Sequence, residues 1–224
     1  MAEHYPFQKT ALPYQYTDLA PRMAPATLFL HHARLLAQDV DSLNQLLARY
    51  PRYQDQSLEQ LISGDLEMPE TDRRRIQNLA GSVYGHRLFF GGMAPPGTGG
   101  LAPRLTMAIE ERYGSMAAFQ ELFRQAGRSI FGAGWAWLNT DPGGALHIAI
   151  TSDNETPELE LFAPVLTLDM WEHAYFLQSP ADPDRYIRNW FSLVNWAAAE
   201  EAYVQAMARP GGSASALAFS PPAG

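Results

Sequence analysis

The stretch GGMAPPGTGG, residues 91–100, divides the chain into two parts with different patterns. Glycine and proline interrupt both helices and strands, so a run this rich in them ends one folded unit and begins another. Helical spacing fills the part before it, and helical spacing mixed with strand-like runs fills the part after it. We therefore predict an N-terminal extended segment and α-hairpin over residues 1–95, and a C-terminal α/β domain over residues 101–207.

The N-terminal part is predicted to be a helical hairpin. Pro25 opens a segment in which leucines recur at helical spacing, and this segment ends near RYPRYQ, residues 49–54. A second helical stretch covers about residues 71–90 and ends at the glycine-proline run. Two helices joined by a polar connection are typical of an αα-hairpin.

The C-terminal part is predicted to be α+β with a small antiparallel sheet. Residues 102–113 and 115–127 have helical spacing, whereas GWAWLNTDPGGALHIAITSD, residues 134–153, has two apolar runs around a DPGG turn. That arrangement is typical of a β-hairpin. PVLTLD, residues 164–169, is a third strand-like run, and residues 183–208 return to helix.

Composition excludes several kinds of site. The 224 residues include no cysteine, which rules out disulfides, thiolate metal ligands and cysteine nucleophiles. The net charge of −8 argues against nucleic acid and anionic membranes as partners.

No run of 18 apolar residues and no signal-peptide pattern is present, so we expect no membrane span and a cytoplasmic location. Residues 208–224, rich in proline, glycine, serine and alanine, are predicted to be a flexible tail.

The segment LTLDMWEHAYF, residues 166–176, places charged groups inside an apolar run. Asp169, Glu172 and His173 lie within five residues of one another, among leucines and aromatic residues. Burying a charge is costly unless it is paired or bound to a metal. The segment therefore indicates either an ion-pair network or a metal site.

Histidines elsewhere in the chain provide further candidate ligands. His31 shares a helix face with part of the leucine stripe, and His86 lies among aromatic residues in VYGHRLFF. With Asp169 and His173 they would form an open site of three imidazoles and one carboxylate, which suits iron, manganese or zinc. The alternative is that each is an ordinary hydrogen-bonded core histidine, and spacing alone leaves both interpretations open. His32 is rotated by about 100° from His31 on the same helix and competes only if the helix register differs.

Four motifs in a fixed order resemble the iron/manganese superoxide dismutase family. They are ALPYQYTDLAP, FGAGWAWL, DMWEHAYF and NWFSLVNW, and the resemblance covers about residues 11–207. It implies a helical hairpin, a C-terminal α/β domain with a three-stranded antiparallel sheet, and a metal held between them. The implied activity is conversion of superoxide to oxygen and hydrogen peroxide. The alternative is a metal-binding or structural homologue with little or no dismutase activity.

The resemblance also implies a set of site residues. By position, the metal ligands fall on His31, His86, Asp169 and His173, with one iron or manganese ion per subunit. Trp135 and Trp171 match tryptophans that line the pocket, although core packing alone would also explain them. Glu172 matches an acid that reaches a ligand histidine of the partner subunit, which implies a homodimer or larger homo-oligomer. A solvated helix charge is the alternative reading of Glu172.

The chain departs from the family where substrate would enter. Asp39 occupies the position of a channel tyrosine, Leu35 that of a neighbouring channel histidine, and Phe176 that of a tyrosine bonded to that histidine across the interface. SPADP, residues 179–183, replaces a run that ends in arginine, and Arg185 lies two positions beyond it. Asp39 could repel superoxide if ionised, donate a hydrogen bond if protonated, bind the metal, or face solvent.

The family's glutamine that hydrogen-bonds to the metal-bound water is also absent. Ser82 occupies its position in the iron type and Asn154 its position in the manganese type, so either is a candidate for holding a metal-bound water. Asn154 and Asp39 are our candidate catalytic residues, and Ser82 is expected to contact a metal ligand or a metal-bound water rather than the metal. Thr167, two residues before Asp169, resembles the iron type. Iron is therefore slightly favoured over manganese.

Overall fold

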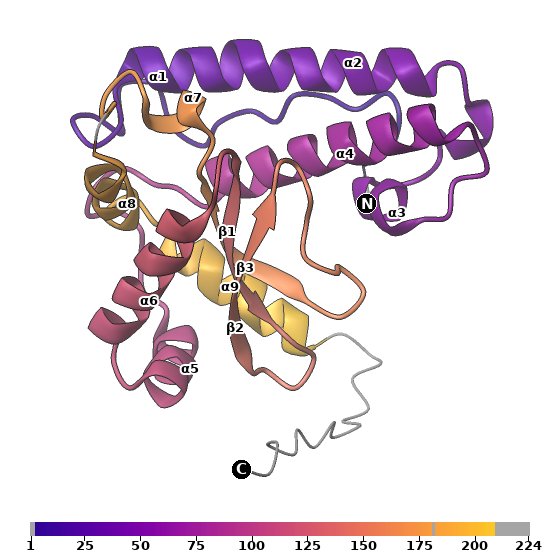
Figure 1. The fold of residues 1–224 in the computed structure, drawn as a ribbon. Coiled ribbons are helices and arrows are strands. Elements are labelled where there is room, and N and C mark those ends of the chain that lie inside the picture. Colours follow the sequence, from indigo (N-terminus) through magenta and orange to yellow (C-terminus); the bar gives the residue numbers. More distant parts are fainter. Residues whose placement is uncertain (1–2, 181, 209–224) are drawn as a thin grey trace.

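Two antiparallel helical arms form the N-terminal part of the computed structural model, which describes residues 3–180 and 182–208 (Figure 1). The first arm joins α1 (Pro25–Leu30), a π-helical turn η1 (His31–Leu36) and α2 (Ala37–Leu47), and the second is α4 (Glu70–Gly91). A 3₁₀ turn η2 (Pro51–Tyr53) and α3 (Leu58–Ser63) lie in the connection. Buried leucines of the first arm pack toward α4, as the predicted hairpin requires.

The π-helical turn is a feature that helical spacing did not predict. It occupies the six residues His31–Leu36 inside an otherwise α-helical arm. Such turns insert an extra residue into the helix and often occur at functional sites. The insertion changes the direction in which His31 and the residues after it point, so a rotation calculated for a regular α-helix does not apply here.

A three-stranded antiparallel sheet forms the centre of the C-terminal part, as expected. Its strands are β1 (Gly134–Thr140), β2 (Leu146–Ser152) and β3 (Ala163–Asp169), in the order β2-β1-β3. Every residue of the central strand β1 is buried, which explains why the apolar residues 134–138 run on without alternation before the buried polar pair Asn139 and Thr140. Gly144 adopts a φ of 86° in the predicted DPGG turn, a conformation that favours glycine.

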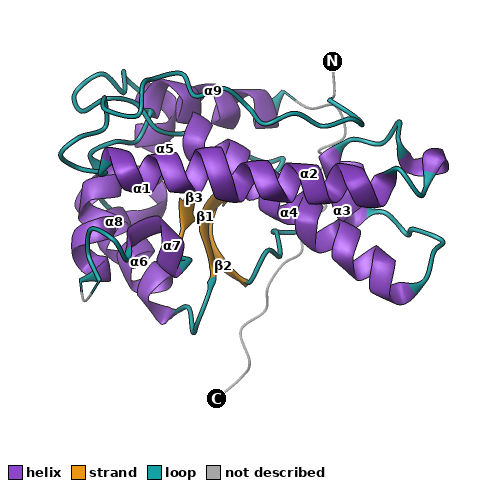
Figure 2. Ribbon diagram, turned by 90° about the horizontal axis from the view of Figure 1, so that it is seen from above, coloured by secondary structure: helices purple, strands orange, loops and turns teal. Residues whose placement is uncertain are grey.

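The other helices of the C-terminal part pack around the sheet and its connections. They are α5 (Pro103–Tyr113), α6 (Met116–Ser129), α7 (Glu172–Tyr175), α8 (Pro183–Phe191) and α9 (Trp196–Met207). α4 and α9 contact β3, and α6 contacts β1. Viewed from above, the first arm crosses over the sheet, with α7 close to α1 (Figure 2). The end of β3 therefore lies directly under the two arms.

Residues 183–208 are mostly helical, as expected, but the chain forms two helices there rather than one. Val194 pairs with Met93, and the N–H of Asn195 donates to the carbonyl of Gly92 at 2.8 Å. The Asn195 side chain then caps α9 by accepting from the N–H of Ala198. The backbone between α8 and α9 thus bonds to the end of α4 instead of continuing a helix, and this contact ties the two halves of the molecule together.

Two further expectations concern the membrane and the tail. Across residues 3–180 and 182–208, every helix is too short or too polar to cross a bilayer. Apart from Ala208, the predicted flexible tail lies outside the described residues.

Candidate metal centre

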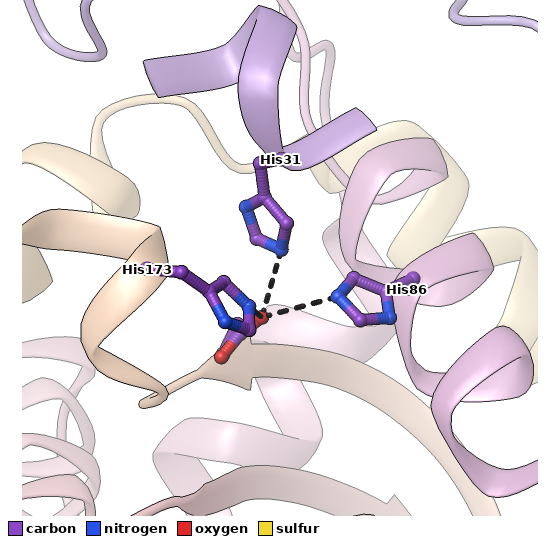
Figure 3. A group of neighbouring side chains, drawn as sticks. His31, His86 and His173 are labelled. Carbon is purple, nitrogen blue, oxygen red and sulfur yellow. Dashed lines mark hydrogen bonds and ion pairs between the residues drawn. The ribbon is translucent and has the colours of Figure 1, made fainter. Parts of the chain in front are cut away.

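Four side chains from four elements converge between the hairpin and the sheet (Figure 3). His31 comes from η1, His86 from α4, Asp169 from the end of β3 and His173 from α7. Their possible ligand atoms all lie within 4.8 Å of one another. The Nε2 atoms of the three imidazoles lie 3.0, 3.6 and 3.3 Å from Oδ2 of Asp169, in chain order.

The carboxylate at the centre is held by the backbone around it. Asp169 is fully buried at the last position of β3, paired in register with Trp135 of β1. Its Oδ1 accepts from the N–H of Trp171 at 2.7 Å, and the hydroxyl of Tyr186 donates to its carbonyl at 2.8 Å. These contacts fix the carboxyl group so that Oδ2 faces the imidazoles.

Two of the imidazoles leave a nitrogen without a partner. Nε2 of His31 and Nε2 of His86 are buried and accept or donate no hydrogen bond within the described residues. Buried polar nitrogens without partners are costly, and a cation among these atoms would satisfy both nitrogens and the carboxylate together. Three imidazoles and one carboxylate without thiolate fit iron, manganese or zinc.

The protonation states of the four residues, before any metal binds, favour metal binding. Burial lowers the pKa of His31, and it lowers the pKa of His86 to about 3. Burial opposes charge on Asp169, but the imidazoles of His173 and His31 lower its pKa overall. Burial also disfavours charge on His173, yet the adjacent Asp169 raises its pKa. Near neutral pH, His31 and His86 are therefore neutral with free lone pairs, and Asp169 is ionised.

Aromatic rings enclose the four residues. The predicted pocket residue Trp135 is fully buried, with its ring centre 5.1 Å from that of His86. Trp171 is half-buried and stacks on His173 at 5.6 Å. A Cβ on Gly85 would lie 3.1 Å from the Trp135 ring, so this glycine makes room for the tryptophan.

Sequence reasoning missed several residues that shape the centre. Phe90 lies 4.9 Å from His31 between ring centres, and Tyr186 orients Asp169 as described above. Phe90 carried a usable signal, because it lies four residues after His86 on one helix and therefore on the same face. Tyr186 carried none, since its contact depends on how α8 packs against the rest of the C-terminal part.

Asp39 and Ser82 lie beside the centre and contact each other. The hydroxyl of Ser82, which is 1% exposed, donates to Oδ2 of Asp39 at 2.5 Å. The same oxygen lies 3.1 Å from Nδ1 of His86. Burial raises the pKa of Asp39, although the Ser82 hydrogen bond opposes that shift. Asp39 is therefore directed inward, which contradicts the alternative of a fully solvated side chain.

Asn154 is placed differently from Ser82. Its amide nitrogen donates to Oδ1 of Asn78 at 3.2 Å, and within the described part of the chain no contact joins it to the four central residues. A Cβ on Gly81 would meet the carbonyl oxygen of Asn154 at 2.1 Å, so the backbone of this loop lies against α4. The catalytic role of Asn154 stays a prediction that its position does not support.

The remaining predicted residues lie around the centre. Leu35 is half-buried, Glu172 is exposed, and Phe176 is 51% exposed. His32 takes no part, because its Nε2 bonds to the carbonyl of Thr10 at 2.7 Å and its Nδ1 to the hydroxyl of Tyr16 at 2.9 Å.

Comparisons with known proteins agree with the fold. The profile of the iron/manganese superoxide dismutase alpha-hairpin domain matches residues 6–94, and that of the C-terminal domain matches residues 101–202. Manganese superoxide dismutase 1 of Leptolyngbya boryana is 37% identical over 203 residues, covering 90% of this chain and 82% of that protein.

Two other relatives extend the comparison. Manganese superoxide dismutase of Thermus aquaticus is 35% identical over 89% of this chain and 98% of its own length. That of Pseudomonas aeruginosa is 34% identical over 88% and 97%. With both domains matched and the four potential ligands in one place, the chain belongs to the iron/manganese superoxide dismutase family.

Proposed function

We propose that this protein is a superoxide dismutase that binds one iron or manganese ion through His31, His86, Asp169 and His173. The observation that carries the proposal is the convergence of three imidazole Nε2 atoms on one buried carboxylate oxygen, two of them without any other partner. Membership of the family supplies the reaction.

The bound metal would supply one-electron chemistry, in which one superoxide is oxidised to oxygen and a second is reduced by that electron and takes up two protons to give hydrogen peroxide. The chain contributes the geometry. Asp169 brings a negative charge whose direction is fixed by the Trp171 N–H. Trp135, Phe90 and Trp171 exclude bulk water from the sides, so that only small molecules reach the centre.

The identity of the metal is the finer part of this proposal. Thr167 favours iron by resemblance, whereas the relatives described above are named as manganese enzymes. Both metals accept imidazole and carboxylate ligands. We retain iron as the slightly favoured ion for this chain.

We also propose that the protein is a homodimer or larger homo-oligomer in the cytoplasm. Exposed apolar side chains of α1 and the α7 region support a covered surface there: Phe29, Leu30, Phe176 and Leu177 are 41%, 45%, 51% and 63% exposed. α1 and α7 contact each other, and Glu172 is exposed on α7 beside the ligand His173. This arrangement would allow Glu172 to reach a ligand histidine of the partner subunit.

Reconstitution tests the proposed activity and its metal. Metal-free protein is loaded separately with iron and with manganese, the bound metal is quantified, and superoxide removal is measured per bound ion. We expect one ion per chain and activity with at least one metal, higher with iron. Full occupancy with negligible activity for both metals would instead establish a metal-binding homologue without dismutase function.

A further inference from the structure

A chain of hydrogen bonds runs from Asp39 through Ser82 to the ring of His86. Asp39 Oδ2 lies 2.5 Å from Ser82 Oγ, and Ser82 Oγ lies 3.1 Å from His86 Nδ1. Nδ1 also lies 2.8 Å from the carbonyl oxygen of Ser82, one helical turn earlier on α4. The three side chains come from the two arms of the hairpin, α2 and α4.

Counting hydrogens along this chain fixes the state of the imidazole. With Asp39 ionised, its carboxylate accepts the single hydroxyl hydrogen of Ser82, so Oγ can only accept a hydrogen bond from Nδ1. The Ser82 carbonyl is also only an acceptor. Nδ1 of His86 must therefore carry the ring hydrogen, which leaves a lone pair on Nε2, the atom that faces Asp169 Oδ2 at 3.6 Å.

We propose that Asp39 is a positioning residue that acts through the Ser82 hydroxyl to hold His86 in its metal-binding tautomer and to strengthen it as a ligand. Carboxylates hydrogen-bonded to metal-ligating imidazoles have this effect when the contact is direct, and here the serine hydroxyl relays it. The inference rests on the proposed function for its metal, but it concerns hydrogen bonds that the protein already contains.

Asp39 lies on the other arm of the hairpin from His86 and is connected to its ring through the Ser82 hydroxyl. Asp39 is half-buried on α2, whereas Ser82 and His86 are almost fully buried on α4. Without an acceptor on α2, the Ser82 hydroxyl could turn its hydrogen toward Nδ1 and compete with the Ser82 carbonyl, which favours a hydrogen on Nδ1. The acid at position 39 thus decides which way the serine hydrogen points.

A double-mutant cycle in zinc affinity tests the relay, because zinc binds imidazole and carboxylate ligands without redox chemistry. We expect Ser82→Ala and Asp39→Leu each to raise the zinc Kd by about 10-fold to 100-fold. We expect Asp39→Leu to have no further effect in the Ser82→Ala background. Ser82→Thr, which keeps the hydroxyl, should restore most of the affinity. Asp41→Leu, exposed on the same helix, is the matched control.

Nitrogen-15 NMR of the His86 ring provides the second readout, in both zinc-loaded and metal-free protein. We expect a hydrogen on Nδ1 in the native chain and a mixture of tautomers in Asp39→Leu, with Asp39→Asn as a closer-shaped variant if the leucine does not fold. An equal effect of Asp39→Leu with and without the Ser82 hydroxyl would overturn the relay. Failure to bind any metal would overturn the proposed function, and the metal-free spectra would still decide the relay.

Discussion

Among single residues, Asp169 is the one on which the proposed metal centre depends most. It is the only carboxylate among the four central residues, and its Oδ2 lies within 3.6 Å of all three imidazole Nε2 atoms. Burial opposes the charge on Asp169, but the imidazoles of His173 and His31 lower its pKa overall, so the carboxylate is ionised and can bind a cation. Metal binding is therefore expected to depend on this residue.

Replacing Asp169 by Asn tests this dependence. The amide can keep the hydrogen bond from the Trp171 N–H while removing the negative charge, so the fold is expected to survive. We expect bound iron or manganese, measured by elemental analysis after purification, to fall about tenfold or more. Asp153→Asn, an exposed position with a φ of 50° that asparagine tolerates, should keep the native metal content. Equal metal content in both variants would contradict a ligand role for Asp169.

The lowered pKa of His86 predicts how the metal-free protein responds to acid. Its pKa is about 3 in the folded chain and 6.5 in the unfolded chain, so the unfolded state binds this proton first. The contribution of neutral His86 to the free energy of unfolding is fully present above pH 6.5. It is lost as pH falls toward 3, by up to about 1.4 kcal/mol per pH unit.

The raised pKa of His173 acts in the opposite sense, so a variant is needed to isolate His86. Urea unfolding of metal-free native protein and His86→Gln at several pH values between about 7 and 5 makes the comparison. We expect the native chain to lose more free energy of unfolding than the variant over this range. Identical slopes would show that His86 is not held neutral by burial.

At the scale of elements, the turn after α7 is tied to the start of α1 by one glutamine. Oε1 of Gln178 accepts from the N–H of Ala24 at 2.6 Å, and its Nε2 donates to the carbonyl of Pro21 at 2.9 Å. The first contact satisfies a free N–H at the beginning of α1. The glutamine thus fixes α7, which carries His173, against the arm that carries His31.

Gln178→Leu is expected to lower the free energy of unfolding by about 0.5–1.5 kcal/mol, because the half-buried N–H of Ala24 and the exposed carbonyl of Pro21 lose their hydrogen bonds. Urea denaturation of the metal-free protein measures the change. Gln205→Leu, which removes a single exposed contact to Glu201, should change stability by less than about 0.5 kcal/mol. A comparable loss in both variants would show that Gln178 has no special structural role.

Some of these elements could be predicted from the sequence, and others could not. The helical hairpin and the DPGG hairpin followed from periodicity and turn residues, because both are local signals. The π-helical turn at His31–Leu36 and the break before Asn195 did not, because each depends on contacts between distant segments. The four candidate ligands followed from motif resemblance, whereas the placement of Asn154 away from the centre depends on how its loop lies on α4.

For the whole molecule, the surface around α1 and α7 is where we propose that a partner subunit binds. The side chain of His173 is 27% exposed, in contrast to those of His31 and Asp169, which are fully buried. A partner subunit on this surface would cover His173 together with the exposed apolar residues beside it. The centre is therefore expected to be complete only in the dimer.

Light scattering of the native chain and Leu177→Glu at micromolar concentration tests this assembly. A charge at this exposed position would be buried without a partner in the dimer, so we expect the native protein to be dimeric and the variant to be largely monomeric. Met107→Glu, at a 70% exposed position on α5, should remain dimeric. A monomeric native protein would contradict the proposed assembly.

The central claim is that one metal ion held by His31, His86, Asp169 and His173 removes superoxide. Its most direct test is the decay rate of superoxide, followed by pulse radiolysis, at graded occupancies of reconstituted iron or manganese. We predict that for the active metal the rate rises in proportion to occupancy from zero in metal-free protein, and that Asp169→Asn at the same total metal concentration stays at the metal-free rate. A rate that is independent of occupancy for both metals would contradict the claim.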